Sequence, residues 1–183
     1  MRARSLCLAL VTTLLLAACA TPVHQPPARD EAFIPDHWET VAVLPFTGDA
    51  AFRRPAGEFF AHGMQKQPYF RIMTPGFAEF VLKRKGESLD ATQITAEQAQ
   101  KLGKLVEAQA VFIGNIVLTR AGAVVFVRAE IKLIDVSQGH VVASVDEPSP
   151  PISYDGYDLA KVAENKAAAE MMVMLEALGK KAR

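Results

Sequence analysis

The nine residues Ala110 to Leu118, AVFIGNIVL, form an apolar run that only Asn115 interrupts. A strand with one solvated face alternates apolar and polar side chains, whereas a strand covered on both faces is apolar throughout. The run therefore indicates a strand buried on both sides of a sheet. We expect a single three-layer domain of the α/β (α+β) class, in which helices flank both faces of the sheet.

Two segments before this run have the β-branched and apolar composition of strands, Thr40–Phe46 (TVAVLPF) and Tyr69–Met73. Pro45 ends the first one, because proline cannot donate a hydrogen bond within a sheet. Between them, a helix is predicted from about Pro55. Its apolar face consists of Phe59, Phe60 and Met64.

Two further helices are predicted before the apolar run. Thr74 and Pro75 are typical of an N-cap and a first helical residue. The buried stripe of this helix is predicted to be Phe77, Phe80 and Val81. Thr95 and Gln98 have the spacing of a capping box, in which each side chain binds a free amide of the first turn. Another helix therefore follows, with an apolar face made of Ala99, Leu102 and Val106.

After the apolar run, Val124–Val136 alternates between apolar and charged residues, as a strand with one wet face does. A polar turn leads to His140–Val145, so these two strands are predicted to form an antiparallel hairpin. A last helix is predicted over about residues 158–178. The expected order is β-α-β-α-α-β-β-β-α, with a mixed sheet of about five strands.

The first residues are typical of a bacterial lipoprotein signal. Arg2 and Arg4 precede an apolar stretch that is about half as long as the ~20 residues of a membrane-spanning helix, which favours a removable signal. The segment Leu16-Ala17-Ala18-Cys19 resembles the lipobox, so residues 1–18 are predicted to be the signal peptide. Cys19 is the predicted lipidation site, with a diacylglycerol and an acyl chain such as palmitate. Ala20 follows it, which by similarity to enterobacterial sorting implies the outer membrane.

Residues 19–37 are interpreted as the lipidated cysteine and a Pro-rich tether, and residues 38–183 as the periplasmic domain. Cys7 lies within the signal and Cys19 carries the lipid, so no disulfide, thiol enzyme or cysteine-ligated metal is expected. Removal of the signal takes two arginines from a balance of 20 basic and 20 acidic residues, which leaves a net charge of about −2. This composition argues against nucleic acid as a partner.

The chain contains no P-loop, GxGxxG, GxSxG or HExxH motif, and its four histidines are far apart. We therefore predict no catalytic residues, no metal site and no cofactor other than the lipid. A domain that binds or hydrolyses small molecules would need a polar pocket, which the sequence does not indicate. Several perturbed carboxylates in one cleft would point to such a domain.

Three groups of residues are candidates for an interface, and each has a simpler interpretation. Alternate residues of one strand place three charges on one face about 7 Å apart, which suits either a solvated face or a subunit contact. A methionine-rich helical turn suits either core packing or a patch that faces a partner. A loop with two tyrosines suits either a turn or a contact loop. These groups are Arg128, Glu130 and Lys132; Met171, Met172 and Met174; and Tyr154 and Tyr157.

Three blocks of the sequence resemble, in this order, the repeated blocks of the CsgG superfamily of bacterial outer-membrane lipoproteins, which includes PelC, FlgO and LpoB. The blocks are Thr40–Phe46, Gln93–Val117 and Ala129–Ser144. The resemblance implies a mixed sheet flanked by helices, a lipid anchor, no cofactor and frequent assembly into rings. The curli channel also has two long hairpins that build a transmembrane barrel. The links Arg71–Thr95 and Val117–Val124 lack the paired, alternating strands of about ten residues that such hairpins need.

Together these features predict a lipid-anchored, periplasm-facing component of an outer-membrane export or envelope-assembly system. Such a component is not an enzyme, and we expect it to form a homo-oligomer or to bind another envelope protein. The alternative is a non-catalytic regulator that binds a periplasmic cell-wall synthase, as LpoB does. A tether of about seventeen residues is short for reaching a distant synthase, which favours the membrane-seated component.

Overall fold

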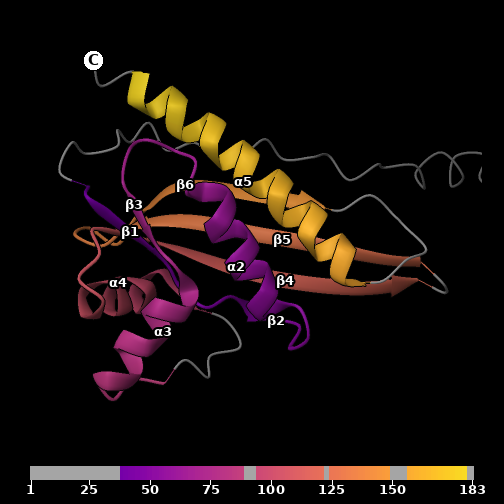
Figure 1. The fold of residues 1–183 in the computed structure, drawn as a ribbon, viewed down its shortest axis with the longest axis horizontal. Coiled ribbons are helices and arrows are strands. Elements are labelled where there is room, and N and C mark those ends of the chain that lie inside the picture. The colour runs from indigo at the N-terminus through magenta and orange to yellow at the C-terminus, as the bar shows by residue number, and fades with distance from the viewer. Residues whose placement is uncertain (1–37, 89–93, 122–123, 149–155, 181–183) are drawn as a thin grey trace, which may run out of the picture.

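The computed structural model describes residues 38–88, 94–121, 124–148 and 156–180 (Figure 1). The signal, Cys19 and the tether lie outside these residues. The described helices and strands are β1 Thr40–Val43, β2 Thr47–Gly48, α2 Arg53–Met64, β3 Arg71–Met73, α3 Pro75–Arg84, α4 Ala96–Leu105, β4 Ala110–Ala121, β5 Val124–Asp135, β6 Val141–Pro148 and α5 Gly156–Lys180. The predicted fold class and element order are confirmed, with the short strand β2 in addition.

The six strands form one mixed sheet in the order β3-β1-β4-β5-β6, with β2 paired to β4. Strand β1 runs parallel to both β3 and β4, so its predicted central position is confirmed. Strands β4, β5 and β6 are antiparallel, which confirms the predicted hairpin between β5 and β6. Strand β1 ends at Val43 rather than at Phe46. The interruption lies at Pro45, whose nitrogen has no hydrogen to donate. After it, the chain pairs with β4 again as the short strand β2.

Helices α2 and α5 cover one face of the sheet and enclose the main core (Figure 1). Phe60 of α2 is fully buried, and its ring meets Phe112 of β4 edge-on with centroids 5.1 Å apart. The two helices approach closely because small residues face each other. A Cβ added at Gly63 would lie only 2.8 Å from the Cβ of Ala168.

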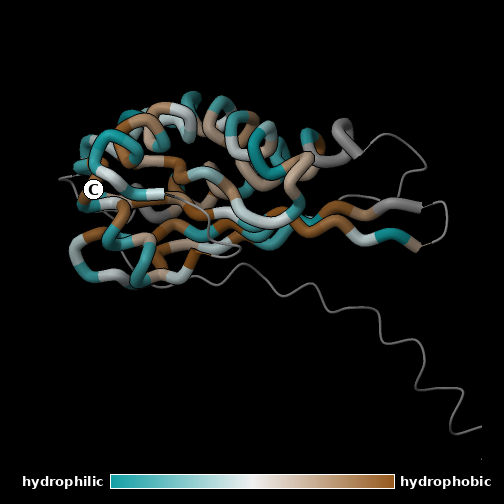
Figure 2. Tube along the Cα trace, turned by 90° about the horizontal axis from the view of Figure 1, so that it is seen from below, coloured by the Kyte–Doolittle hydropathy of each residue, from teal (hydrophilic) through white to brown (hydrophobic). Residues whose placement is uncertain are grey.

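Helices α3 and α4 cover the other face of the sheet, but only at one end. A second cluster of buried side chains lies under them, against β1 and the beginning of β4. Strand β4 is buried up to Gly114 and at Ile116, whereas its last residues, from Thr119, are exposed. The expectation that the Ala110–Leu118 run is covered on both faces is therefore right only for its first part. Figure 2 shows the β4–β5 hairpin extending beyond the end of the sheet that is covered on both sides.

The predicted buried stripe of α3 is wrong for Phe77 and Phe80, whereas Val81 packs half-buried against the second core cluster. Phe77 and Phe80 are 55% and 54% exposed, and the residues that α3 buries are Pro75, Ala78 and Leu82. The physical reason is the position of the second core cluster, because Ala78 and Leu82 lie on the side of α3 that packs into it. The two phenylalanines lie on the opposite side of the helix and face outwards.

The predicted starts of α3 and α4 are confirmed, but they are capped differently. Thr74 is the N-cap of α3 and makes no side-chain cap hydrogen bond. Instead, the amide of Gly76 donates to Oε1 of Glu58, which reaches over from α2 at 3.0 Å. Helix α4 has the predicted capping box, with Gln98 N donating to Thr95 Oγ1 at 3.2 Å and Thr95 N donating to Gln98 Oε1 at 3.0 Å.

Helix α5 begins at Gly156 and spans 25 residues. It lies across β5 and β6 with its alanines and methionines against the sheet. Neither α5 nor any other helix among the described residues has the length and apolarity of a membrane span.

Candidate functional site

Among the described residues, no element covers β4 beyond Gly114, or the neighbouring parts of β5 and β6, on the side of α3 and α4, and we call this surface the open sheet face. Its side chains come from alternate positions of three antiparallel strands, so they point to the same side. Two of them are large and apolar, Val117 at 38% and Phe126 at 37% exposure. The members are Asn115, Val117, Thr119, Phe126, Arg128, Glu130, Lys132, Ser144 and Asp146.

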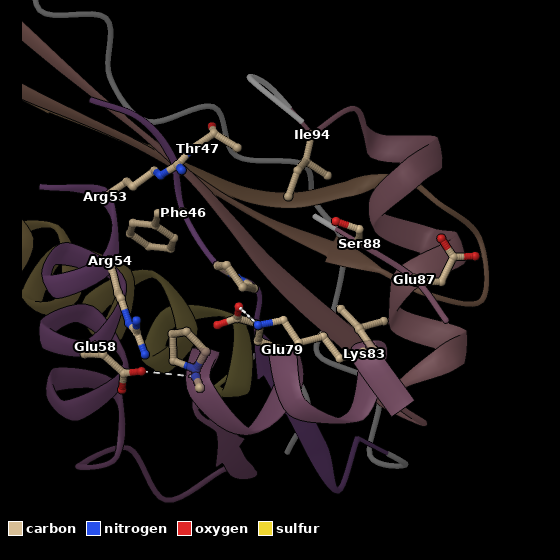
Figure 3. A pocket seen from close by; sticks show the side chains of 14 residues that line it. Phe46, Thr47, Arg53, Arg54, Glu58, Glu79, Lys83, Glu87, Ser88 and Ile94 are labelled. Carbon is tan, nitrogen blue, oxygen red and sulfur yellow. Dashed lines mark hydrogen bonds and ion pairs between the residues drawn. The ribbon is translucent and has the colours of Figure 1, made fainter. Parts of the chain in front are cut away.

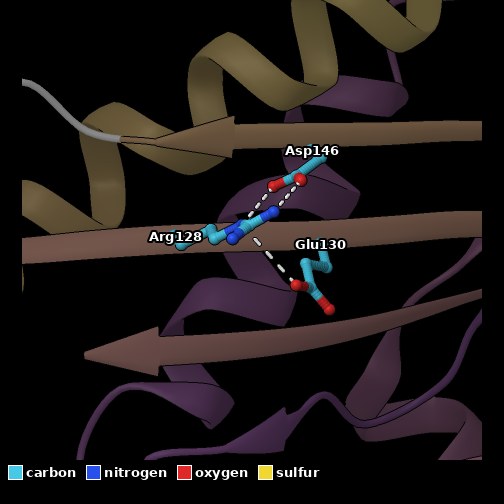
Figure 4. A network of polar contacts seen from close by, with 3 residues as sticks. All are labelled: Arg128, Glu130 and Asp146. Carbon is cyan, nitrogen blue, oxygen red and sulfur yellow. Dashed lines mark hydrogen bonds and ion pairs between the residues drawn. The ribbon is translucent and has the colours of Figure 1, made fainter. Parts of the chain in front are cut away.

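The predicted charged row lies on this open sheet face and forms part of an ion network (Figure 4). Arg128 donates from Nε to Oδ1 of Asp146 at 2.6 Å and from a terminal nitrogen to the other oxygen, so the contact is bidentate. Its Nε also lies 3.5 Å from Oε1 of Glu130. Hydrogen bonding to Asp146 raises the pKa of Arg128. Lys132 lies on the same face, and no carboxylate among the described residues is within ion-pair distance of it.

One cation therefore serves two carboxylates in this network, and Lys132 supplies a second cation on the same face, so the four side chains together carry no net charge. The partner across the strands, Asp146, was missed by the sequence analysis. The signal that could have found it is the hairpin register, since Asp146 lies directly opposite Glu130 and diagonally from Arg128.

The methionine-rich turn of α5 faces the core. Met171 is fully buried, Met174 is buried, and Met172 packs against the same cluster from a half-buried position. Core packing thus accounts for these side chains. The residue of this turn that faces outwards is Val173, at 66% exposure.

The remaining predicted positions fall at or beyond the limits of the described residues. Tyr154 and Cys19 lie outside them. The expected loop ends before Tyr157, which belongs to the first turn of α5. His62 on α2 and His140 before β6 lie on separate elements, and no group of described residues could hold a metal ion.

A polar cleft of about 260 Å³ lies between α2, α3 and the segment after β1 (Figure 3). Its carboxylates already have partners within the chain. Glu79 pairs with Lys83 at 2.7 Å, and Glu58 accepts from the Gly76 amide. Hydrogen bonding to Lys83 lowers the pKa of Glu79. A lowered carboxyl pKa is the reverse of what a general acid needs near neutral pH.

The cleft is therefore the polar pocket that the sequence did not indicate, but its groups are not arranged for proton transfer. Glu87, on its rim, pairs with Lys101 of α4 at 2.8 Å. Arg53 and Arg54 also line it, and neither has a carboxylate within ion-pair distance in the described part of the chain. An ion pair within α3, a hydrogen bond from α3 to α2 and an ion pair to α4 thus account for the cleft's carboxylates.

Two carboxylates are fully buried beneath α5. Glu147 of β6 forms an ion pair with Lys166 of α5. Glu164 of α5 has no hydrogen-bond partner among the described residues on either carboxylate oxygen. Burial raises the pKa of Glu164 well above its usual value, because removal from water disfavours the charged form of the carboxyl group.

An exposed aromatic surface on α3 was not expected from the sequence. The rings of Phe77 and Phe80 lie side by side with centroids 6.3 Å apart, and the guanidinium of Arg84 lies 5.8 Å from the centre of the Phe80 ring. Arg84 has no carboxylate within ion-pair distance among the described residues. We call Phe77, Phe80 and Arg84 the α3 aromatic face.

The sequence matches no family model and no curated protein. The fold, however, is similar to that of solved structures. The PelC dodecamer from Paraburkholderia phytofirmans is 17% identical over 82% of this chain and 94% of that one, with a TM-score of 0.52. Lipoprotein GNA1162 from Neisseria meningitidis is 14% identical over 73% of this chain and 97% of that one, with a TM-score of 0.53. The chain thus has a PelC-like fold, in agreement with the fold that the sequence resemblance implied.

Proposed function

We propose that this chain is a lipid-anchored, periplasm-facing structural subunit of an outer-membrane export or envelope-assembly system, and that it self-associates. The observation that carries this proposal is the open sheet face, where exposed apolar side chains and a charge network lie on a sheet surface that no described element covers. A PelC of the same fold forms a dodecamer, and GNA1162 is a lipoprotein. The first property supports the proposed self-association, and the second supports the predicted anchor at Cys19.

The open sheet face is suited to burial against a partner. Arg128, Glu130 and Asp146 already satisfy one another, so covering them separates no charge from its counter-ion. Removing solvent from a network of this kind costs less than burying an isolated charge. Val117 and Phe126 add apolar area beside it. We propose that Arg128, Glu130 and Lys132 lie in the contact.

The role is structural rather than catalytic. The carboxylates of the polar cleft are engaged in ion pairs or helix capping, as described above. No cofactor is required for such a role, and the covalent lipid on Cys19 is the only proposed attachment to the membrane.

The decisive measurement is the mass of the detergent-extracted protein by light scattering, with the detergent contribution subtracted. Self-association predicts a mass of several subunits that is retained on dilution to micromolar concentration. A single-subunit mass at high concentration would reject the assembly and leave the monomeric regulator of a cell-wall synthase. Mass spectrometry of the N-terminal peptide tests the anchor separately, because an acylated Cys19 adds the mass of three lipid chains, whereas Cys19→Ala is expected to be released from the membrane fraction.

A further inference from the structure

The predicted tether joins the domain at one end of the sheet. The described residues start with Trp38, directly before β1. Strands β1, β3 and β4 are parallel, so they all begin at this end, which we call the tether end. Figure 1 shows α3 and α4 beside β1, away from the tip of the β4–β5 hairpin.

Helix α3 ends at the tether end. The amide of Thr40 donates to Oε1 of Gln109 at 2.7 Å, so the beginning of β1 lies beside the segment that precedes β4. In that segment, Oε1 of Glu107 pairs with Nζ of Lys85 at 3.2 Å. Lys85 directly follows α3, so Arg84 in the last turn of this helix lies at the end of the domain where the tether enters.

The α3 aromatic face has the composition of a helix that lies at a membrane surface. Phe77 and Phe80 are just over half exposed and lie side by side, and the guanidinium of Arg84 lies over the Phe80 ring. Their spacing of three and four residues places all three side chains on one side of the helix. Helices of the membrane interface carry aromatic side chains at the level of the headgroups and basic side chains beside them.

The ends of α3 and α4 carry an excess of positive charge. Residues 79–88 and 101–107 contain five basic and three acidic residues. Each of the three carboxylates forms an ion pair with a lysine. Arg84 and Lys104 are therefore left without a carboxylate within ion-pair distance in the described part of the chain. Each such cation near an anionic lipid surface favours binding about fivefold.

The length of the tether makes a weak contact sufficient. Cys19 precedes Trp38 by nineteen residues. A chain of that length spans at most about 65 Å when it is fully extended. An acylated Cys19 therefore holds the tether end close to the leaflet, and this confinement raises the effective concentration of the α3 aromatic face at the lipid surface.

We propose that the α3 aromatic face docks on an anionic membrane leaflet, with the rings of Phe77 and Phe80 at headgroup level and Arg84 beside lipid phosphate. This inference rests on the proposed lipid anchor and names the surface of the domain that faces the membrane. The core cluster under α3 lies against β1 and the beginning of β4, whereas the open sheet face lies beyond Gly114. Docking on the membrane thus leaves the open sheet face available to a second copy.

The test places an environment-sensitive fluorophore on the docked surface of the acylated full chain. Phe77→Cys supplies the one reactive thiol, because Cys7 lies in the predicted signal and acylation blocks Cys19. In vesicles of phosphatidylethanolamine and phosphatidylglycerol, the emission should shift to the blue, and lipids with brominated acyl chains should quench it. A label that stays in contact with water in these vesicles would overturn the proposal.

A second substitution tests the contribution of charge. Arg84→Glu in the labelled chain should lower the ratio of docked to undocked label about twenty-five-fold, since one favourable charge is lost and one unfavourable charge is added. Vesicles of phosphatidylcholine alone should also give weaker quenching than the anionic vesicles. Equal quenching in both kinds of vesicle would contradict docking on an anionic surface.

Val173→Cys is the matched control, because Val173 is an exposed apolar residue of α5, which covers the opposite face of the sheet. A label at this position should keep the emission of a water-exposed fluorophore in the same vesicles. Quenching as strong as that of the Phe77→Cys label would contradict the assignment to α3. Circular dichroism should show the same fold for all variants.

Failure of this inference is distinguishable from failure of the proposed function. The mass in detergent and the N-terminal peptide report self-association and the anchor without any label on α3. If the chain is acylated and self-associates while the Phe77→Cys label stays in water, the docking surface is wrong and the proposed function stands. A blue shift without quenching by brominated lipid would show that protein covers this face, which also overturns docking on the membrane. If Cys19 carries no acyl chain, the proposed function fails as well.

Discussion

Replacing Glu164 by leucine should stabilise the protein. The side chain is fully buried within α5, and neither carboxylate oxygen has a hydrogen-bond partner. Leaving a buried polar group unsatisfied costs about 1–3 kcal/mol, and an apolar side chain of similar volume removes that cost. For a domain of this size, the gain corresponds to a rise in melting temperature of about 2–12 °C.

The gain should depend on pH in a defined direction. Because burial raises the native pKa of Glu164 above its usual value of 4.5, the unfolded chain releases this proton at a lower pH than the native protein does. Wild-type stability should therefore fall as pH rises from about 4.5 towards the native pKa, by about 1.4 kcal/mol per pH unit from this group. Below about pH 4.5, the Glu164 carboxyl is protonated in both the native and the unfolded protein, so its contribution to stability no longer changes with pH.

Urea unfolding of wild type and Glu164→Leu at pH 4, 5, 6 and 7 measures this difference, since all other titrating groups cancel between the two proteins. The free energy of unfolding of the variant should exceed that of the wild type by an amount that grows with pH. Glu164→Gln, which removes the ionisation but keeps a polar group, should show the same pH trend with a smaller overall gain. A difference between wild type and Glu164→Leu that is constant across this range would refute the reasoning.

Three further substitutions test the packing and the local hydrogen bonds. Phe60→Ala should destabilise the fold by about 3–5 kcal/mol in urea unfolding, because its ring fills the space between Phe112 and Phe46; a loss below about 1 kcal/mol would contradict that placement. Gly103→Ala should lower the melting temperature measured by calorimetry, since the added Cβ would lie 2.3 Å from a methyl carbon of Val136. Gly86→Ala is the control, because a Cβ there would have no atom within 4 Å, so only the backbone strain of alanine at a positive φ should lower its melting temperature. Asp135→Ala should cost about 1–3 kcal/mol at neutral pH, because the carboxylate accepts from the Ser137 hydroxyl at 2.5 Å and the Gln138 amide at 2.8 Å. Burial tends to raise the pKa of Asp135, but these hydrogen bonds outweigh it and lower the pKa below 3.8. The difference in unfolding free energy between variant and wild type should therefore persist above pH 3.8 and shrink as the pH falls through the native pKa.

Local signals with a specific geometry predicted the structure well. The Thr95 and Gln98 capping box forms as expected, because it depends on residues within one helical turn. The alternation along β5 placed Arg128, Glu130 and Lys132 on one face, because strand geometry alone fixes this. By contrast, the ion partner Asp146 comes from the neighbouring strand, and only the pairing register brings it close.

The apolar run of β4 shows why burial on both faces was only partly predicted. Hydrophobicity indicates that a side chain is removed from water, but it does not say whether the cover comes from the same chain or from another. Phe112 is buried by the chain's own helix α2, whereas Val117, in the same run, is left on the open sheet face. A contact with another molecule would bury apolar side chains that the chain's own helices leave exposed.

Helix α3 also shows that hydrophobicity alone does not identify which apolar side chains the fold buries. It carries two apolar stripes, and periodicity alone favours the one with the larger residues, Phe77 and Phe80. Instead, α3 buries Pro75, Ala78 and Leu82, because Ala78 and Leu82 face the core cluster beneath the helix. Full burial of a phenylalanine contributes about 1.5–3 kcal/mol, so two rings that remain just over half exposed could gain about 1.5–3 kcal/mol together on docking. That gain is too small to hold two copies together by itself, because association first costs several kcal/mol of lost freedom. Assembly that is retained on dilution in detergent, where no shared membrane holds the copies together, would therefore require a contact that buries more apolar area than these two rings provide.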